Sequence, residues 1–81
     1  MKITVRFYSI SKDLAARNEM EVIVENNTTL ETALEAVFKQ IPALKKIHAS
    51  TMYAIGVDYA TPSSRLHEGD IISILPPMQG G

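Results

Sequence analysis

The chain has 81 residues, which is enough for one domain and too few for a second hydrophobic core. Its 8 Lys and Arg residues against 9 Asp and Glu residues give a formal net charge of −1, and they form no basic patch of the kind that binds nucleic acid. The absence of cysteine excludes disulfide bonds, thiolate catalysis and cysteine-based metal sites.

The first part of the chain predicts two strands joined by a helical turn. Residues 2–9 and residues 19–25 alternate apolar and polar side chains, as half-buried strands do. Between them, residues 11–16 are helix formers, and Ser11 is expected to cap the turn. We therefore expect an antiparallel strand pair. Because no apolar run approaches the ~20 residues that cross a bilayer and no signal-peptide pattern is present, a cytoplasmic protein is expected.

A long amphipathic helix is expected next. Thr28 or Thr29 caps its start, and Thr28 with Glu31 fits a capping box. Pro42 ends the helix near Gln40. We expect its apolar side to pack across the sheet as core, with a partner-binding helix as the less favoured alternative. That side is formed by Leu30, Leu34, Val37, Phe38 and Ile41.

The rest of the chain predicts three further strands. Residues 43–51 form a connection, residues 52–57 a strand, and residues 58–61 a short returning strand. Leu66 is expected to re-enter the core before residues 70–75, a run rich in Ile that is typical of a mostly buried strand.

This order of elements predicts an α+β protein with the β-grasp, or ubiquitin-like, fold. A mixed sheet of four to five strands would pair the first and last strands in parallel at its centre, with one long helix packed across it. A ferredoxin-like fold would need a second full helix after the third strand, and the segment there is too short. We expect a β-grasp domain over residues 1–77 and a flexible tail over residues 78–81.

Catalytic and metal-binding patterns are missing from the sequence. His48 and His67 are isolated in loop-like stretches, where surface or capping roles are more common than catalysis. Asp58, Glu68 and Asp70 are typical turn residues. No phosphate-binding loop and no metal-ligand spacing is present. We expect a domain without an active site of its own, without a bound cofactor and without a metal.

The C-terminal end is the candidate reactive site. Pro76 and Pro77 stop the preceding strand, and the chain then ends at Gly80 and Gly81. A terminus without side chains can enter a narrow channel and present its carboxylate for activation by ATP as an acyl-adenylate. The alternative is a frayed end without function. Because the chain has no cysteine, any sulfur that it carries must be attached to this terminus.

A docking surface is expected next to the tail. Since strand side chains alternate, Ile72 and Ile74 point inward and their neighbours point outward. Scattered surface hydrophobic residues are the alternative interpretation. The expected docking surface consists of Tyr8, Tyr59, Ile71 and Leu75.

These motifs resemble the MoaD/ThiS sulfur-carrier family over essentially the whole chain. The start of the chain is similar to the family's first strand and helical turn, with the residues Val5-Arg6-Phe7-Tyr8-x-x-x-Lys12-Asp13-Leu14. The end resembles the family's C-terminal signature, with Leu66-x-x-Gly69-Asp70-x-Ile72 followed by Leu75-Pro76-Pro77-x-x-Gly80-Gly81.

The resemblance implies a carrier that other proteins act upon. An ubiquitin-activating-like adenylyltransferase would use ATP to adenylate Gly81, which would then become a thiocarboxylate. The tail, with Gly80, would enter the large subunit of molybdopterin synthase, in a heterotetramer, and donate sulfur to cyclic pyranopterin monophosphate. Pro76, Pro77 and Met78 would contact partners together with the docking surface. The chain would be a non-catalytic subunit that binds neither nucleic acid nor membrane.

Two alternatives stay open. The chain could be a ubiquitin-like modifier that forms isopeptide bonds through Gly81, or a sulfur carrier for thiamine synthesis or tRNA thiolation. The modifier and the carrier need the same activated Gly-Gly end, so the residues do not separate them.

Overall fold

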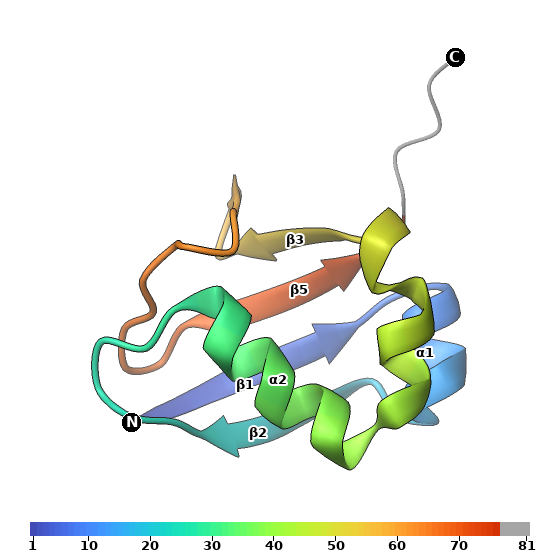
Figure 1. Cartoon of the computed structure of the whole chain (residues 1–81), viewed down its shortest axis with the longest axis horizontal. Coiled ribbons are helices and arrows are strands. Elements are labelled where there is room, and N and C mark those ends of the chain that lie inside the picture. The colour runs from blue at the N-terminus through green and yellow to red at the C-terminus, as the bar shows by residue number, and fades with distance from the viewer. Residues whose placement is uncertain (77–81) are drawn as a thin grey trace.

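The computed structural model describes residues 1–76, in which five strands form one sheet (Figure 1). The strands are β1 (Lys2–Phe7), β2 (Glu19–Ile23), β3 (Met52–Ile55), β4 (Asp58–Tyr59) and β5 (Ile71–Leu75). Their order is β2-β1-β5-β3-β4, and β1 and β5 pair in parallel while the other neighbours are antiparallel. The predicted β-grasp fold is therefore confirmed. The predicted boundary after residue 77 lies outside the described residues.

Helix α2 (Leu30–Gln40) crosses one face of this sheet (Figure 1) and encloses the core. Leu34 and Val37 are buried as predicted, whereas Phe38 and Ile41 are only partly buried and pack against the core at its margin. Leu66 returns to the core as expected. The main core side chains are Ile3, Val5, Phe7, Met20, Val22, Leu30, Leu34, Val37, Leu44, Leu66, Ile72 and Ile74.

The cap of α2 differs from the predicted capping box. Thr29 is the N-cap, and its Oγ1 accepts a hydrogen bond of 3.4 Å from the Thr32 N–H. Thr28 cannot start the helix, because its carbonyl accepts the Leu66 N–H at 2.8 Å and holds this residue in the preceding loop. The residue three positions after the cap is consequently Thr32 and not Glu31.

The expected cap of the first helical turn is also wrong. Helix α1 (Ile10–Ala15) has Ser9 at its N-cap, with φ 57° and no side-chain bond to the helix. Ser11 lies inside the fold instead, with 1% of its surface exposed. Its Oγ accepts the Tyr8 N–H at 3.0 Å and lies within donating distance of two carbonyl oxygens, that of Tyr8 at 2.7 Å and that of Ile74 at 3.3 Å. Ser11 therefore ties the end of β1 to β5.

The connection after α2 is more regular than predicted. Residues Pro42–Ser50 form a 3-10 helix, η1, which carries the buried Leu44. β3 then ends at Ile55, earlier than expected, because a two-residue turn follows. Gly56 takes φ +63° in the first position of that turn, as a type II′ hairpin requires. Within residues 1–76 no helix is both long and apolar enough to cross a membrane.

Candidate docking face and C-terminal end

Helices α2 and η1 lie on the same side of the sheet and leave its other face, the open face, uncovered (Figure 1). Cross-strand pairing arranges the side chains there in rows. Tyr59 lies opposite Ala54, which lies opposite Ser73, and the next row pairs Met52 with Leu75. Residues directly opposite each other share a face, so these side chains are neighbours on the open face.

Three of the four predicted docking residues meet in one shallow hollow of about 290 Å³. Tyr8 and Tyr59 are 41% and 64% exposed, and Leu75 is partly exposed beside them. Ile71 does not line the hollow, because it lies at the opposite end of β5, next to Thr4. The predicted surface is thus brought together except at this residue. The complete lining is Tyr8, Ala54, Gly56, Val57, Tyr59, Ser73 and Leu75.

Val57 is a member of this surface that sequence reasoning missed. It occupies the tip of the β3–β4 hairpin and is 98% exposed, the largest value among the exposed large apolar side chains of residues 1–76. The sequence signal was available, since Gly56 followed by one residue between two strand patterns is typical of a two-residue hairpin. An apolar side chain at such a tip is fully available to a partner.

The other half of the open face is charged. Lys2 pairs with Glu21 at 3.5 Å, and Arg6 pairs with Glu19 at 3.3 Å, both across β1 and β2. These pairs are largely exposed and contribute little to stability. The face therefore has an apolar half over β5, β3 and β4 and a mainly polar half over β1 and β2, where the exposed Ile23 lies opposite Lys2.

The end of β5, which leads into the C-terminal tail, is held in place by contacts on both sides. Leu75 is the last residue of β5, with β3 on one side through Met52 and the Ser11 hydroxyl bonded to the carbonyl of the preceding Ile74. Pro76 follows and is exposed. The other predicted site residues, Pro77, Met78, Gly80 and Gly81, lie outside the described residues, so the reactive terminus stays a prediction.

The isolated polar residues take structural roles. Asp70 accepts the His67 N–H at 2.7 Å and closes a turn, as its sequence context predicts. Nδ1 of His48 lies 2.7 Å from the Tyr53 hydroxyl, and burial raises the pKa of Tyr53 from 10.0 to about 12. In the described part of the chain no three His, Asp or Glu side chains are grouped to hold a metal ion.

Comparison with known proteins decides the family. The sequence profile of the ThiS family matches residues 5–81, nearly the whole chain. The chain belongs to the ThiS family. The resemblance to MoaD/ThiS sulfur carriers that the C-terminal motif indicates is thereby confirmed.

Proteins similar to this ThiS-family chain are named either as subunits of molybdopterin-forming complexes or as modifier proteins. A molybdopterin synthase sulfur carrier subunit from Chlamydomonas reinhardtii is 28% identical over 83 residues, covering 100% of both chains. Subunit 1 in a complex of subunits 1 and 2 of the molybdopterin-converting factor from Helicobacter pylori is 27% identical, with a TM-score of 0.70 and full coverage of both chains. SAMP1 from Haloferax volcanii, a small archaeal modifier protein, has a TM-score of 0.89 at 19% identity, also with full coverage. The last likeness shows the fold alone.

Proposed function

We propose that this ThiS-family chain is the sulfur-carrier small subunit of a molybdopterin synthase. It donates sulfur from a thiocarboxylate at Gly81 to cyclic pyranopterin monophosphate, in molybdenum cofactor biosynthesis. The observation that carries the proposal is the position of Leu75. This residue both lines the apolar hollow of the open face and ends the strand that leads to Gly80 and Gly81. A partner docked on the hollow therefore lies at the start of the tail.

The chemistry resides at the terminus. The Gly81 carboxylate attacks the α-phosphorus of ATP, pyrophosphate leaves, and an acyl-adenylate forms. Hydrosulfide then displaces AMP to give the thiocarboxylate. The thiocarboxylate sulfur then bonds to a carbon of the pterin precursor to form a thioester, and water cleaves the acyl–sulfur bond, which leaves the sulfur on the pterin and regenerates the carboxylate. The activating adenylyltransferase and the large subunit supply the catalytic side chains, and the carrier supplies a bare backbone that can enter both active sites.

The length of the tail limits where a partner can bind. From Leu75 to Gly81 the chain extends at most ~20 Å, at roughly 3.3–3.6 Å per residue. The partner must therefore hold the open face within that distance of its own active site. The apolar half of the face, with Tyr8, Tyr59 and Val57 exposed around the hollow, is suited to such close docking.

A protein modifier is the second candidate function. The same Gly-Gly end, once adenylated, can react with a lysine amine to form an isopeptide bond. The fold likeness to SAMP1 supports keeping this candidate, since modifiers use the same architecture. The two functions differ in the nucleophile that meets the activated terminus, which is sulfide in one and a protein amine in the other.

Reconstitution separates these functions. The full chain would be incubated with its activating enzyme, ATP and sulfide, and intact mass spectrometry would detect the exchange of one oxygen for sulfur at the terminus. Addition of the large subunit and cyclic pyranopterin monophosphate should then yield molybdopterin. A chain without Gly81 should fold normally and give neither product. Conjugation to protein lysines without formation of the thiocarboxylate would overturn the proposal in favour of the modifier.

A further inference from the structure

A second concave surface lies on the helix side of the sheet, away from the docking face. It is a groove of about 600 Å³ between α2, η1 and β3, at the margin where α2 leaves β3 uncovered. Tyr53 from β3 is nearly buried there, and Phe38 from α2 is only partly buried. The lining is Leu30, Glu31, Leu34, Glu35, Phe38, Lys39, Pro42, Lys45, His48, Tyr53, Ala60 and Pro62.

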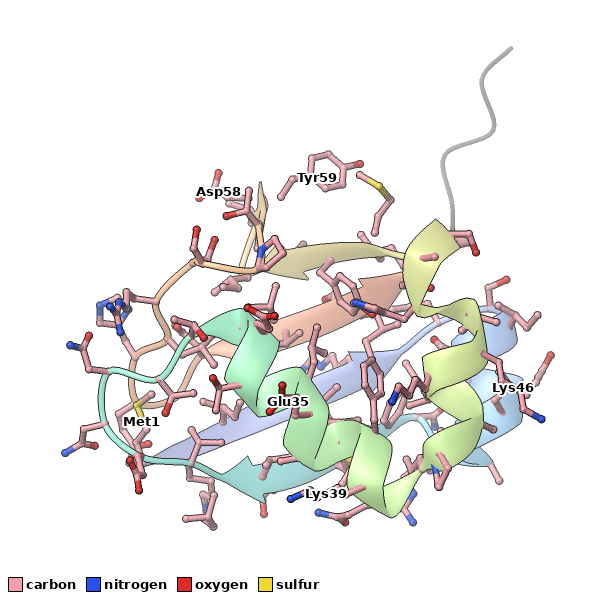
Figure 2. All side chains as sticks on the ribbon, in the orientation of Figure 1. Met1, Glu35, Lys39, Lys46, Asp58 and Tyr59 are labelled. Carbon is pink, nitrogen blue, oxygen red and sulfur yellow. The ribbon has the colours of Figure 1, made fainter. Side chains whose placement is uncertain are left out.

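Charged side chains divide the rim of this groove into an acidic and a basic end. Glu31 lies in the first turn of α2, where its N–H donates to the Pro62 carbonyl at 3.0 Å, and Glu35 lies one turn later, in the middle of the helix. Lys39, in the last turn of α2, and Lys45, on η1, lie toward the other end. Glu35 and Lys39 follow one another along the same side of α2 (Figure 2). The groove is therefore apolar along its length and has opposite charges at its two ends.

These rim charges have no ion-pair partner within residues 1–76. Glu31, Glu35, Lys39 and Lys45 are all exposed, and none of them forms a salt bridge in the described part of the chain. His48 is held against the apolar part of the groove, because its Nδ1 lies 2.7 Å from the Tyr53 hydroxyl and its ring packs edge-on against Phe38. A ligand with the opposite distribution of charge would satisfy both ends at once.

We propose that this groove binds a short extended segment of a partner protein, with a basic residue at one end, apolar residues in the middle and an acidic residue at the other end. The dimensions agree, since α2 advances ~14 Å between Leu30 and Lys39 at 1.5 Å per residue. An extended segment of about four residues spans that length. Its basic side chain meets Glu31 and Glu35, and its acidic side chain meets Lys39 and Lys45.

This binding site is independent of the proposed sulfur transfer. The groove is lined by α2 and η1, which cover the side of the sheet opposite the open face (Figure 1), so a segment in the groove leaves Tyr8, Tyr59 and Leu75 free. A partner held in the groove could therefore remain attached while the activating enzyme and the large subunit exchange on the open face.

The test uses capped synthetic tetrapeptides and amide NMR spectra of the full chain. The peptide Lys-Leu-Leu-Glu should shift the amides of Leu34, Phe38 and Tyr53 and leave those of Tyr8 and Leu75 unchanged. The peptides Lys-Leu-Leu-Lys and Glu-Leu-Leu-Glu should bind more weakly, and Lys-Ser-Ser-Glu should not bind, because it lacks the apolar centre.

Matched variants show whether the rim charges select the ligand. Lys45→Glu should weaken binding of Lys-Leu-Leu-Glu by roughly threefold or more, the effect expected from exposed ion pairs. Lys46→Glu is the control, because Lys46 is the next residue on η1, does not line the groove and points away from α2 (Figure 2). Glu35→Lys should remove the preference at that end, because Glu31 remains there and the two charges cancel, so that Lys-Leu-Leu-Glu and Glu-Leu-Leu-Glu bind with similar affinity.

Several outcomes would overturn the proposal. Equal affinity of all four peptides, equal effects of Lys45→Glu and Lys46→Glu, or peptide-induced shifts confined to the open face would each contradict it. Shifts of the groove amides that depend on protein concentration without peptide would assign the groove to a second copy of the chain. None of these outcomes bears on thiocarboxylate formation, so failure here is distinguishable from failure of the proposed function.

Discussion

At the scale of single residues, Ser11 shows how one hydroxyl connects segments that are distant in the sequence. Its Oγ bonds the backbone of Tyr8 and faces the carbonyl of Ile74, 63 residues further along the chain. Apart from the phenol of Tyr53, it is the only buried polar side chain within residues 1–76, and it is fully bonded. Because Ile74 precedes Leu75, this contact also places the point from which the tail leaves the sheet.

Ser11→Ala should therefore lower the free energy of unfolding. The substitution removes the acceptor of the partly buried Tyr8 N–H and the donor to the buried Ile74 carbonyl, which costs roughly 1–3 kcal/mol. Urea denaturation would measure the loss. Ser50→Ala is the matched control, since that hydroxyl is exposed and donates to the Ile47 carbonyl at 3.2 Å, and a change within about 0.5 kcal/mol is expected. Similar losses in both variants would contradict the role given to Ser11.

Tyr53 should make stability depend on pH in the alkaline range. Its pKa is raised by burial from 10.0 to about 12. The neutral phenol is favoured in the fold, so this contribution is present below pH 10 and is lost as the pH rises from about 10 to about 12. The full effect is roughly 2–3 kcal/mol. Urea denaturation across this range would follow the decrease, and Tyr53→Phe should remove that part of it. An identical pH profile in the Tyr53→Phe protein would disprove the assignment.

At the scale of elements, α2 has two roles along one helix. Its inner side, with Leu34 and Val37, completes the core, and its margin, with Phe38, forms a wall of the groove. The apolar period of the helix identified both sets of residues as one stripe. The stripe is wider than the part of the sheet that α2 covers, and this leaves Phe38 only partly buried.

Two substitutions in α2 should therefore differ. Leu34→Ala removes a fully packed side chain and should cost roughly 2–5 kcal/mol. Phe38→Ala should cost less, because part of this ring already faces solvent. Thermal and urea unfolding of both variants would measure the difference. An equal or larger loss for Phe38→Ala would mean that its ring is a core residue and that the groove is closed in solution.

At the scale of the whole molecule, the sheet separates two surfaces. The open face has an apolar half that adjoins the start of the tail, and the opposite side has the groove with its charged ends. A small domain can serve several partners in turn when its surfaces do not overlap. This separation is the physical basis for treating docking and groove binding as independent events.

Leu75→Glu, with Tyr8→Glu as its companion, should weaken binding to the activating enzyme and to the large subunit. Both residues line the hollow, and a carboxylate buried there without a partner is costly. Both are at least partly exposed, so the domain should stay folded. Titration calorimetry with each purified partner would measure the loss. Ile71→Glu is the control, since Ile71 shares the strand but does not line the hollow, and its effect should be smaller. Unchanged affinity of a folded Leu75→Glu protein would mean that docking uses another face.

Patterns among residues close in the sequence were sufficient to predict the architecture. The period of two in the last strand correctly assigned Ile72 and Ile74 to the core and Leu75 to the open face, because alternation depends only on backbone geometry. The helical period and Pro42 likewise placed α2, and the order of elements allowed only one arrangement with a central parallel pair. The sequence by itself also identified the Gly-Gly end and the family.

Tertiary structure alone decided which distant groups meet. The residues that follow Ser11 in the sequence predict a helix cap. In the fold β5 lies close to Ser11, and the buried hydroxyl connects the end of β1 to β5. Thr29 is the cap because the Leu66 N–H donates to the carbonyl of Thr28 and holds Thr28 in the preceding loop. The groove exists because η1 and β3 close around the margin of α2, a consequence of packing that no single segment encodes. Hydrogen bonds and cavities depend on pairs of segments far apart in the chain, whereas periodicity and turn chemistry act between near neighbours.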